Sequence, residues 1–150
     1  MAGNLTREEA RERARILDVD SYAVELDLTS GDQTFTSTTV IRFACSEPGA
    51  TSFVDLTAPT VHEVRLNGTA LDVAEVFDGE RITLPSLQAD NELRVVADAA
   101  YMRTGEGLHR FVDPVDGNVY LYTQFETADA HRMYACFDQP DLKATFELTV

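Results

Sequence analysis

The chain has 150 residues, of which 44% are hydrophobic and 25% are charged, a balance typical of one globular domain with its own core. Twelve basic residues against 26 acidic ones give a formal net charge of −14, which argues against nucleic acid and against anionic membranes as partners. The sequence contains no apolar run of membrane-spanning length and no signal peptide, so we expect a cytoplasmic protein.

The first predicted element is a helix that begins after Thr6, which forms a capping-box pattern with Glu9. We expect a solvated helix with one thin apolar stripe and with four cations among its glutamates: Arg7, Arg11, Arg13 and Arg15. From Asp18 onward the pattern alternates, which predicts a half-buried strand. After a turn at 29–32, a second strand over 35–45 is expected to pair with the first as a hairpin.

Short strands follow at regular spacing, over residues 51–56, 61–66, 81–84, 91–97, 119–123 and 144–150. The Asn67-Gly68 pair predicts a tight hairpin turn, because both residues accept a positive φ. Three glycines, a proline and two aspartates predict a folded loop over residues 101–117. Roughly eight strands separated by turns predict a mainly β domain, either an antiparallel β-sandwich or a large curved sheet.

The sequence offers little for metal or nucleophilic chemistry. His62-Glu63 resembles the start of a zinc-binding helix, but position 66 is leucine where the second imidazole is needed, and the segment reads as a strand. Cys45 and Cys136 are too few for a disulfide framework or a zinc cage and are expected to be buried thiols. We therefore expect no metal ion bound by this chain.

The stretch over residues 119–141 is the main candidate for function, because its strand ends in polar residues. Gln124 and Glu126 lie two apart, so in an extended chain they share a face, and together they could hold an ammonium group. An alternative is that Glu126 caps a short helix over residues 127–133. Arg132 is expected to form a local ion pair with one of two carboxylates, Asp129 or Asp138.

Three ordered blocks carry a family resemblance: residues 101–111 (YMRTGEGLHRF), 120–126 (YLYTQFE) and 136–144 (CFDQPDLKA). The chain resembles the N-terminal domain of zinc metallo-aminopeptidases of the aminopeptidase N type, especially the actinobacterial enzymes. The resemblance implies a saddle-shaped antiparallel β-domain that packs against a thermolysin-like catalytic domain. It also implies that Glu126 binds the free α-ammonium group of a peptide substrate, that Gln124 lines the pocket for the first side chain, and that Phe125 belongs to the core.

The catalytic parts of that family are missing from these residues. The substrate motif Gly-Ala-Met-Glu-Asn and the zinc-binding His-Glu-x-x-His do not occur in the chain. We therefore expect residues 1–150 to be a single N-terminal domain, truncated near its C-terminal end, that is inactive alone and belongs to a longer enzyme with zinc in its catalytic domain. Two alternatives are a stand-alone β-sandwich interaction module and an assembly domain of a relative that has lost the catalytic part.

Overall fold

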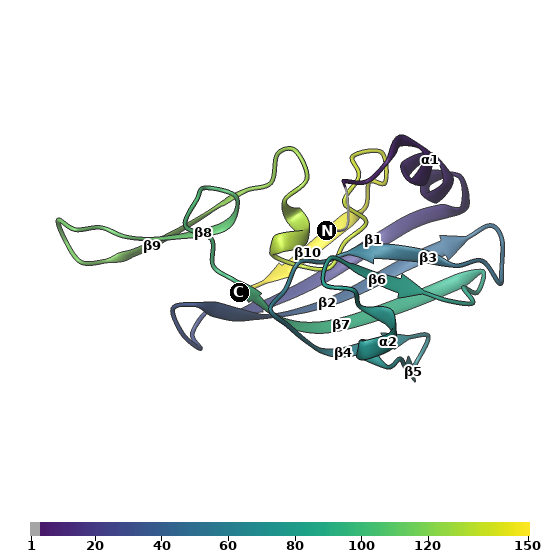
Figure 1. Ribbon diagram of the computed structural model, residues 1–150, viewed down its shortest axis with the longest axis horizontal. Helices are drawn as coiled ribbons and strands as arrows, with labels where there is room; N and C mark the ends of the chain where they lie inside the picture. The colour runs from purple at the N-terminus through teal and green to yellow at the C-terminus, as the bar shows by residue number, and fades with distance from the viewer. Residues whose placement is uncertain (1–3) are drawn as a thin grey trace.

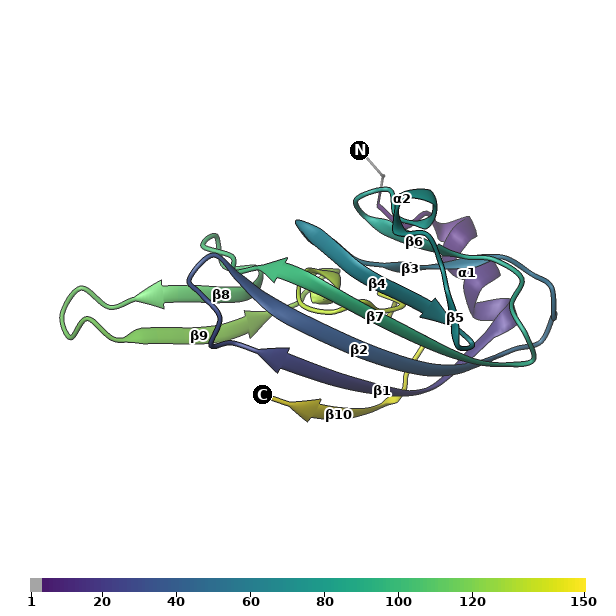
Figure 2. The ribbon, with the colours of Figure 1, turned by 90° about the horizontal axis from the view of Figure 1, so that it is seen from below.

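A curved six-stranded sheet forms the larger layer of the computed structural model, which describes residues 4–150 (Figure 1). In spatial order its strands are β10 (Thr145–Thr149), β1 (Leu17–Asp27), β2 (Thr34–Cys45), β7 (Asp90–Ala100), β4 (Thr60–Leu66) and β5 (Thr69–Ala70). The smaller layer pairs β3 (Ser52–Asp55) with β6 (Arg81–Leu84). It lies over one face of the large sheet together with two helices, α1 (Arg7–Ile16) and α2 (Val73–Val76) (Figure 2). The predicted fold class is confirmed.

Helix α1 (Arg7–Ile16) begins as the sequence predicts. Thr6 Oγ1 accepts a hydrogen bond from Glu9 N at 3.2 Å, and Glu9 Oε2 accepts one from Thr6 N at 2.8 Å, so the capping box is complete. The prediction that all four cations are solvated is wrong for Arg13, which is only 2% exposed. Its side chain enters the space between the helix and the loops that precede β10, where it forms one ion pair, with Asp55, and hydrogen bonds.

The predicted hairpin of β1 and β2 is confirmed, with Tyr22 opposite Ile41 in an antiparallel register. Alternate residues of β1 are buried, as the sequence pattern requires for a sheet with one face on the core. On the other side of β1, β10 is parallel, with Phe146 opposite Tyr22 and their rings stacked at 4.6 Å between centroids. The sheet is therefore antiparallel except at this edge.

The core lies between the two layers and is built from the inward residues of both sheets, including Phe35, Ile41, Val54, Ile82 and Leu93. At the far edge, Asn67 and Gly68 adopt φ values of 54° and 80°, and they join β4 to β5 in the tight turn that the sequence predicts. The short helix α2 (Val73–Val76) follows.

The folded loop expected over residues 101–117 is wrong. Residues Gly107–Val112 form a strand, β8, which pairs in antiparallel fashion with β9 (Val119–Gln124). This hairpin projects away from the large sheet in both views (Figures 1 and 2). The expectation failed because β8 has glycine at its first position and alternates poorly, so it lacks the pattern of a strand that lies on a core.

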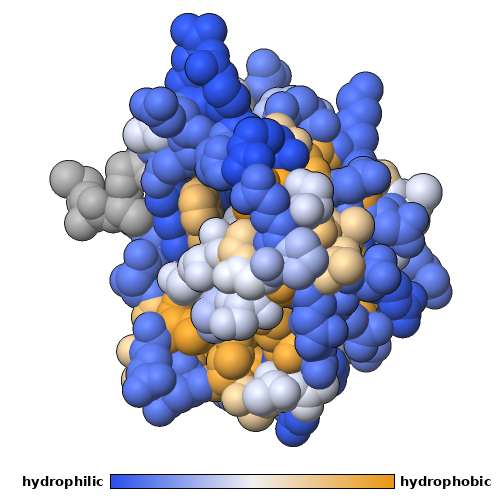
Figure 3. All heavy atoms as spheres, turned by 90° about the vertical axis from the view of Figure 1, so that its right-hand side faces the viewer, coloured by the Kyte–Doolittle hydropathy of each residue, from blue (hydrophilic) through white to orange (hydrophobic). Residues whose placement is uncertain are grey.

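Large exposed hydrophobic side chains are confined to two places within residues 4–150, the β8–β9 hairpin with its turn and the strand β10 with the residue after it. They are Phe111, Val112, Val115, Val119, Tyr120, Leu121, Tyr122, Phe146, Leu148 and Val150. Figure 3 shows the opposite end of the molecule, where hydrophilic side chains cover most of the surface around smaller hydrophobic areas. No helix within residues 4–150 is long and apolar enough to cross a bilayer.

Candidate recognition site at the end of the hairpin

Gln124 is the last residue of β9, and Glu126 lies just beyond it in a turn. Both residues are exposed. The structure brings them together through the backbone, because Glu126 N donates a hydrogen bond to Gln124 Oε1 at 3.0 Å. The Glu126 carboxylate itself has no hydrogen-bond or ion-pair partner among residues 4–150, so its charge faces outward.

The alternative that Glu126 caps a helix over residues 127–133 is wrong. The only helical turn there is the 3₁₀ helix η1 (Ala130–Arg132), and its N-cap residue is Asp129. A 3₁₀ turn of three residues replaces the expected helix, and Glu126 lies three residues ahead of the cap. A capping role therefore does not explain an acid at this position.

Phe125 anchors the turn between these two polar residues. It is half-buried, packs against the core, and meets the Tyr134 ring edge-on, with 6.1 Å between centroids and 83° between ring planes. Phe125 thus fixes the backbone of the turn against the core, while Gln124 and Glu126 on either side of it remain exposed.

Asp129 closes the other end of the turn. Its backbone N–H donates to Phe125 O at 3.0 Å, and its Oδ1 accepts from Arg132 Nε at 2.8 Å. The local ion pair predicted for Arg132 is therefore confirmed with Asp129. Asp138, the other carboxylate considered, bonds instead to His131, whose Nδ1 lies 2.7 Å from Asp138 Oδ2.

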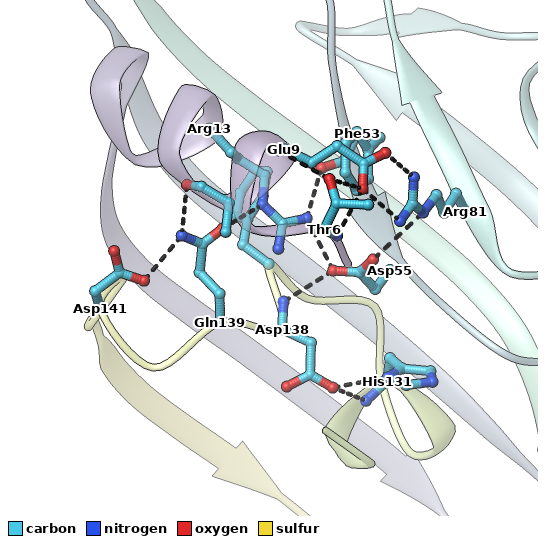
Figure 4. A network of polar contacts seen from close by, with 12 residues as sticks. Thr6, Glu9, Arg13, Phe53, Asp55, Arg81, His131, Asp138, Gln139 and Asp141 are labelled. Carbon is cyan, nitrogen blue, oxygen red and sulfur yellow. Dashed lines mark hydrogen bonds and ion pairs between the residues drawn. The ribbon is translucent and has the colours of Figure 1, made fainter. Parts of the chain in front are cut away.

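A buried polar network holds the segment that follows the turn (Figure 4). Asp55 Oδ2, on β3, accepts hydrogen bonds from Arg13 Nη1 at 2.8 Å and from Asp138 N at 3.0 Å. Arg13 Nε donates to Gln139 Oε1 at 2.7 Å, and its guanidinium carbon lies 4.7 Å from the centroid of the Phe53 ring. Helix α1, strand β3 and the segment before β10 are thus joined at one buried cation.

Backbone hydrogen bonds reinforce this attachment. Thr57 N donates to His131 O at 2.9 Å, and Asp55 forms an antiparallel bridge with Cys136. Around the rim of the network, Arg81 Nη1 pairs with Glu9 Oε1 at 2.6 Å. The hydrogen bond from Arg81, together with the one from the Thr6 backbone, lowers the pKa of Glu9 to about 2.

The sequence did not predict the buried roles of Arg13, Asp55 and Gln139 in this network. Arg13 was expected at the surface, because it lies among charged neighbours on an amphipathic helix. The one signal that could have indicated it is its place near Ile16 on the helix, which is the other buried residue of α1.

The residues that resembled a metal motif have structural partners. His62 is on β4 and bonds through Nε2 to Asp98 Oδ2 at 2.8 Å, and the neighbouring Glu63 pairs with Arg94 and Arg65. Within residues 4–150, no group of three His, Cys, Asp or Glu side chains is arranged to hold a metal ion. Both cysteines are buried and free, as predicted, and burial raises the pKa of Cys136 well above its ordinary value.

Comparison with known protein families gives one match over most of the chain. The family described as Peptidase M1 N-terminal domain matches residues 19–150. Among curated relatives, the chain is 64% identical over 150 residues to an aminopeptidase N of Streptomyces lividans, a match that covers 98% of this chain and 18% of that protein. It is 34% identical over 103 residues to a probable aminopeptidase 1 of Sulfurisphaera tokodaii, covering 59% of this chain and 12% of that protein.

Solved structures of the same fold are also similar. An aminopeptidase A of Legionella pneumophila superposes with a TM-score of 0.73 at 14% identity, over 88% of this chain and 15% of that one. A variant M1 zinc metallopeptidase of Deinococcus radiodurans gives a TM-score of 0.68 at 21% identity, over 89% of this chain and 32% of that one. At these identities the superpositions establish the fold alone. The chain spans less than a fifth of the length of the curated relatives described above.

Proposed function

Since the chain belongs to the Peptidase M1 N-terminal domain family, we propose that it is the substrate-recognition domain of a zinc aminopeptidase, an enzyme that removes amino-terminal residues from peptides. In this proposal Glu126 binds the free α-ammonium group of the substrate, and Gln124 lines part of the pocket for the first side chain. The catalytic step takes place on another domain of the same protein, and residues 1–150 alone are inactive.

The observation that carries the proposal is the unpaired carboxylate of Glu126, held on an anchored turn. A carboxylate that meets an ammonium group away from water gains a charge-assisted hydrogen bond. A substrate with a blocked amino terminus would leave that carboxylate buried and unpaired, and this cost would select for free amino termini. The hydrogen bond from Glu126 N to Gln124 Oε1 links the two proposed site residues and so supports a shared role.

We also propose that the catalytic domain docks against the exposed hydrophobic side chains. They lie on the same hairpin that ends at Gln124 and on β10. A concentration of exposed apolar side chains in a chain with a net charge of −14 is typical of a protein interface. A catalytic domain seated against this hairpin would bring its active site next to Gln124 and Glu126, and it would bury the apolar side chains.

Zinc is proposed for that other domain, because the described residues of this chain do not offer a fitting set of ligands. When bound, the metal ion would supply Lewis-acid activation of the reaction. The contribution of this chain is restricted to binding and orienting the substrate terminus. The cytoplasmic location expected from the sequence stays a prediction that fractionation of cells would test.

The test replaces Glu126 by Gln and by Ala in the full-length aminopeptidase. We expect kcat/KM on amino-acid arylamides to fall by roughly 10²- to 10⁴-fold, mainly through KM, as for the loss of a desolvated charge pair. Glu25, an exposed acid on β1, provides the matched control as Glu25→Gln. Activity of the Glu126 variants within a few-fold of wild type would refute the recognition role.

A further inference from the structure

The turn that carries Glu126 is enclosed by a ring of contacts. On one side, Glu126 N donates to Gln124 Oε1, and on the other, Asp129 N donates to Phe125 O. Asp129 then accepts a hydrogen bond from Arg132 Nε at 2.8 Å. Residues 126–128 are exposed, and the contacts on either side of them end at Arg132.

Arg132 also contacts the β8–β9 hairpin, at Gly107. A β-carbon placed on Gly107 would lie 3.0 Å from Arg132 Cβ and 3.5 Å from Arg132 Cδ, so the arginine stem crosses the backbone of Gly107. Gly107 is the residue paired with Gln124 in the β8–β9 ladder. The ring thus closes from Gln124 through Phe125, Asp129, Arg132 and Gly107 back to Gln124, and Glu126 is joined to it by the hydrogen bond from Glu126 N to Gln124 Oε1.

The ion pair in this ring is too exposed to matter much for global stability. The side chains of Arg132 and Asp129 are 32% and 23% exposed, and partly exposed pairs contribute about 0–1 kcal/mol to unfolding. We expect the ion pair to affect substrate binding more than stability, because it helps to fix the position of the turn. A displacement of about 1 Å at a binding group is enough to change rates by roughly 100-fold. The arrangement is suited to hold a position rather than to stabilise the fold.

We propose that Arg132 is a positioning residue that sets the place of the Glu126 carboxylate, and with it the affinity for the ammonium group of the substrate. This inference rests on the proposed function of Glu126. The guanidinium does not need to touch the substrate: it acts by joining Asp129 to the hairpin at Gly107.

The experiment uses the full-length aminopeptidase with Arg132→Met, which keeps an apolar stem over Gly107 and removes the bond to Asp129. We expect KM for an amino-acid arylamide to rise roughly 10- to 100-fold with kcat nearly unchanged. The inhibition constant of N-acetylated peptide hydroxamate, which has no free amino group, should not change. Arg132→Lys should restore part of the affinity, and Arg103→Met, an exposed arginine whose hydrogen bond is to Asp32 O, is the control.

A double-mutant cycle with Glu126→Gln decides whether the effect passes through Glu126. If Arg132 only positions that carboxylate, Arg132→Met adds nothing in the Glu126→Gln background. The inference would be overturned if the losses of affinity caused by the two substitutions simply add. It would also be overturned if Arg132→Met weakens binding only of substrates with a free carboxylate, because Arg132 would then bind the substrate itself. If Glu126→Gln alone has no effect, the proposed function fails; if only Arg132→Met has none, the positioning role alone fails.

Discussion

Arg13 Nη1 on α1 lies 2.8 Å from Asp55 Oδ2 on β3, and the pair is buried, with 2% and 9% of the two residues exposed. The same carboxylate oxygen accepts from Asp138 N, in the segment that leads from η1 to β10. A charge pair at this depth is retained only when most of its hydrogen-bonding groups are satisfied. Here it joins three parts of the chain that are far apart in sequence.

Replacing Arg13 by Met should therefore be strongly destabilising. The variant leaves the Asp55 carboxylate buried without its closest cation, since Arg81 Nε lies 4.0 Å from Asp55 Oδ1, and we expect the free energy of unfolding to fall by about 3–5 kcal/mol. Urea unfolding of the chain, followed by circular dichroism, measures the change. Arg11→Met, on the exposed side of the same helix, is the control and should stay within about 0.5 kcal/mol of wild type. Equal effects of the two variants would contradict the assigned role of Arg13.

Alanine substitutions at Gly107 and Gly117 allow the cost of a strained backbone to be distinguished from the cost of a steric contact. Both have a positive φ, of 65° and 72°, but a β-carbon at Gly107 would press on Arg132, whereas one at Gly117 would meet nothing within 4 Å. Gly117→Ala should cost about 1–2 kcal/mol of stability from the left-handed backbone alone. Gly107→Ala should cost about 1–3 kcal/mol more, because the side chains of Arg132 and Met102 must move. Urea unfolding of both variants gives the comparison, and similar losses would show that Arg132 and Met102 move aside at little cost in stability.

Glu9 should contribute stability that depends on pH. Because its pKa in the folded protein is about 2, below the ordinary value of 4.5, its contribution is present above pH 4.5 and is lost as the pH falls toward 2. Glu9→Gln keeps a capping-box side chain but loses the charge that pairs with Arg81. The variant should be less stable than wild type at pH 7, and the difference should shrink between pH 5 and pH 3.

Unfolding curves measured at each pH test this expectation. Glu8→Gln, an exposed neighbour in the same turn, is the control and should show a much smaller difference at pH 7. The Glu9 side chain is 35% exposed, so added salt should also reduce its contribution. A difference that stays constant from pH 7 to pH 3 would mean that the charge of Glu9 does not contribute.

The two thiols should be unreactive in the folded protein. Cys45 and Cys136 are buried, and burial raises the pKa of Cys136, so little thiolate is available at pH 8. Iodoacetamide at pH 8 should label neither residue in buffer and both residues in concentrated urea, as measured by mass spectrometry. Rapid labelling of Cys136 in buffer would show that the segment before β10 opens readily.

Several elements were predictable because their signals are local. The capping box of Thr6 and Glu9, the alternation in β1, and the Asn67-Gly68 turn each depend on residues that are close in sequence, and all three are confirmed. The family resemblance, carried by three ordered blocks, is also confirmed by the match over residues 19–150. The roles of Gln124 and Glu126 stay a proposal.

The strand β8 and the short turn η1 were missed for a common reason. Both lie in the part of the chain that projects from or wraps around the core, where hydrophobic periodicity does not report on secondary structure. Propensity favoured a loop in the first case and a helix in the second. In the structure, residues 107–112 pair with β9 as a strand, and His131 O in η1 accepts a hydrogen bond from Thr57 N.

The sequence by itself determined the class of the fold, the start of the helix, the main hairpins and the family, because periodicity, caps and ordered motifs are written along the chain. Only the tertiary structure decided that Arg13 is a buried anchor, that β10 joins the sheet in parallel, and that Arg132 lies across Gly107 beside Gln124. These facts depend on contacts between residues that are distant in sequence, and the free energy of burying a charge or filling the space over a glycine is settled only when those residues meet.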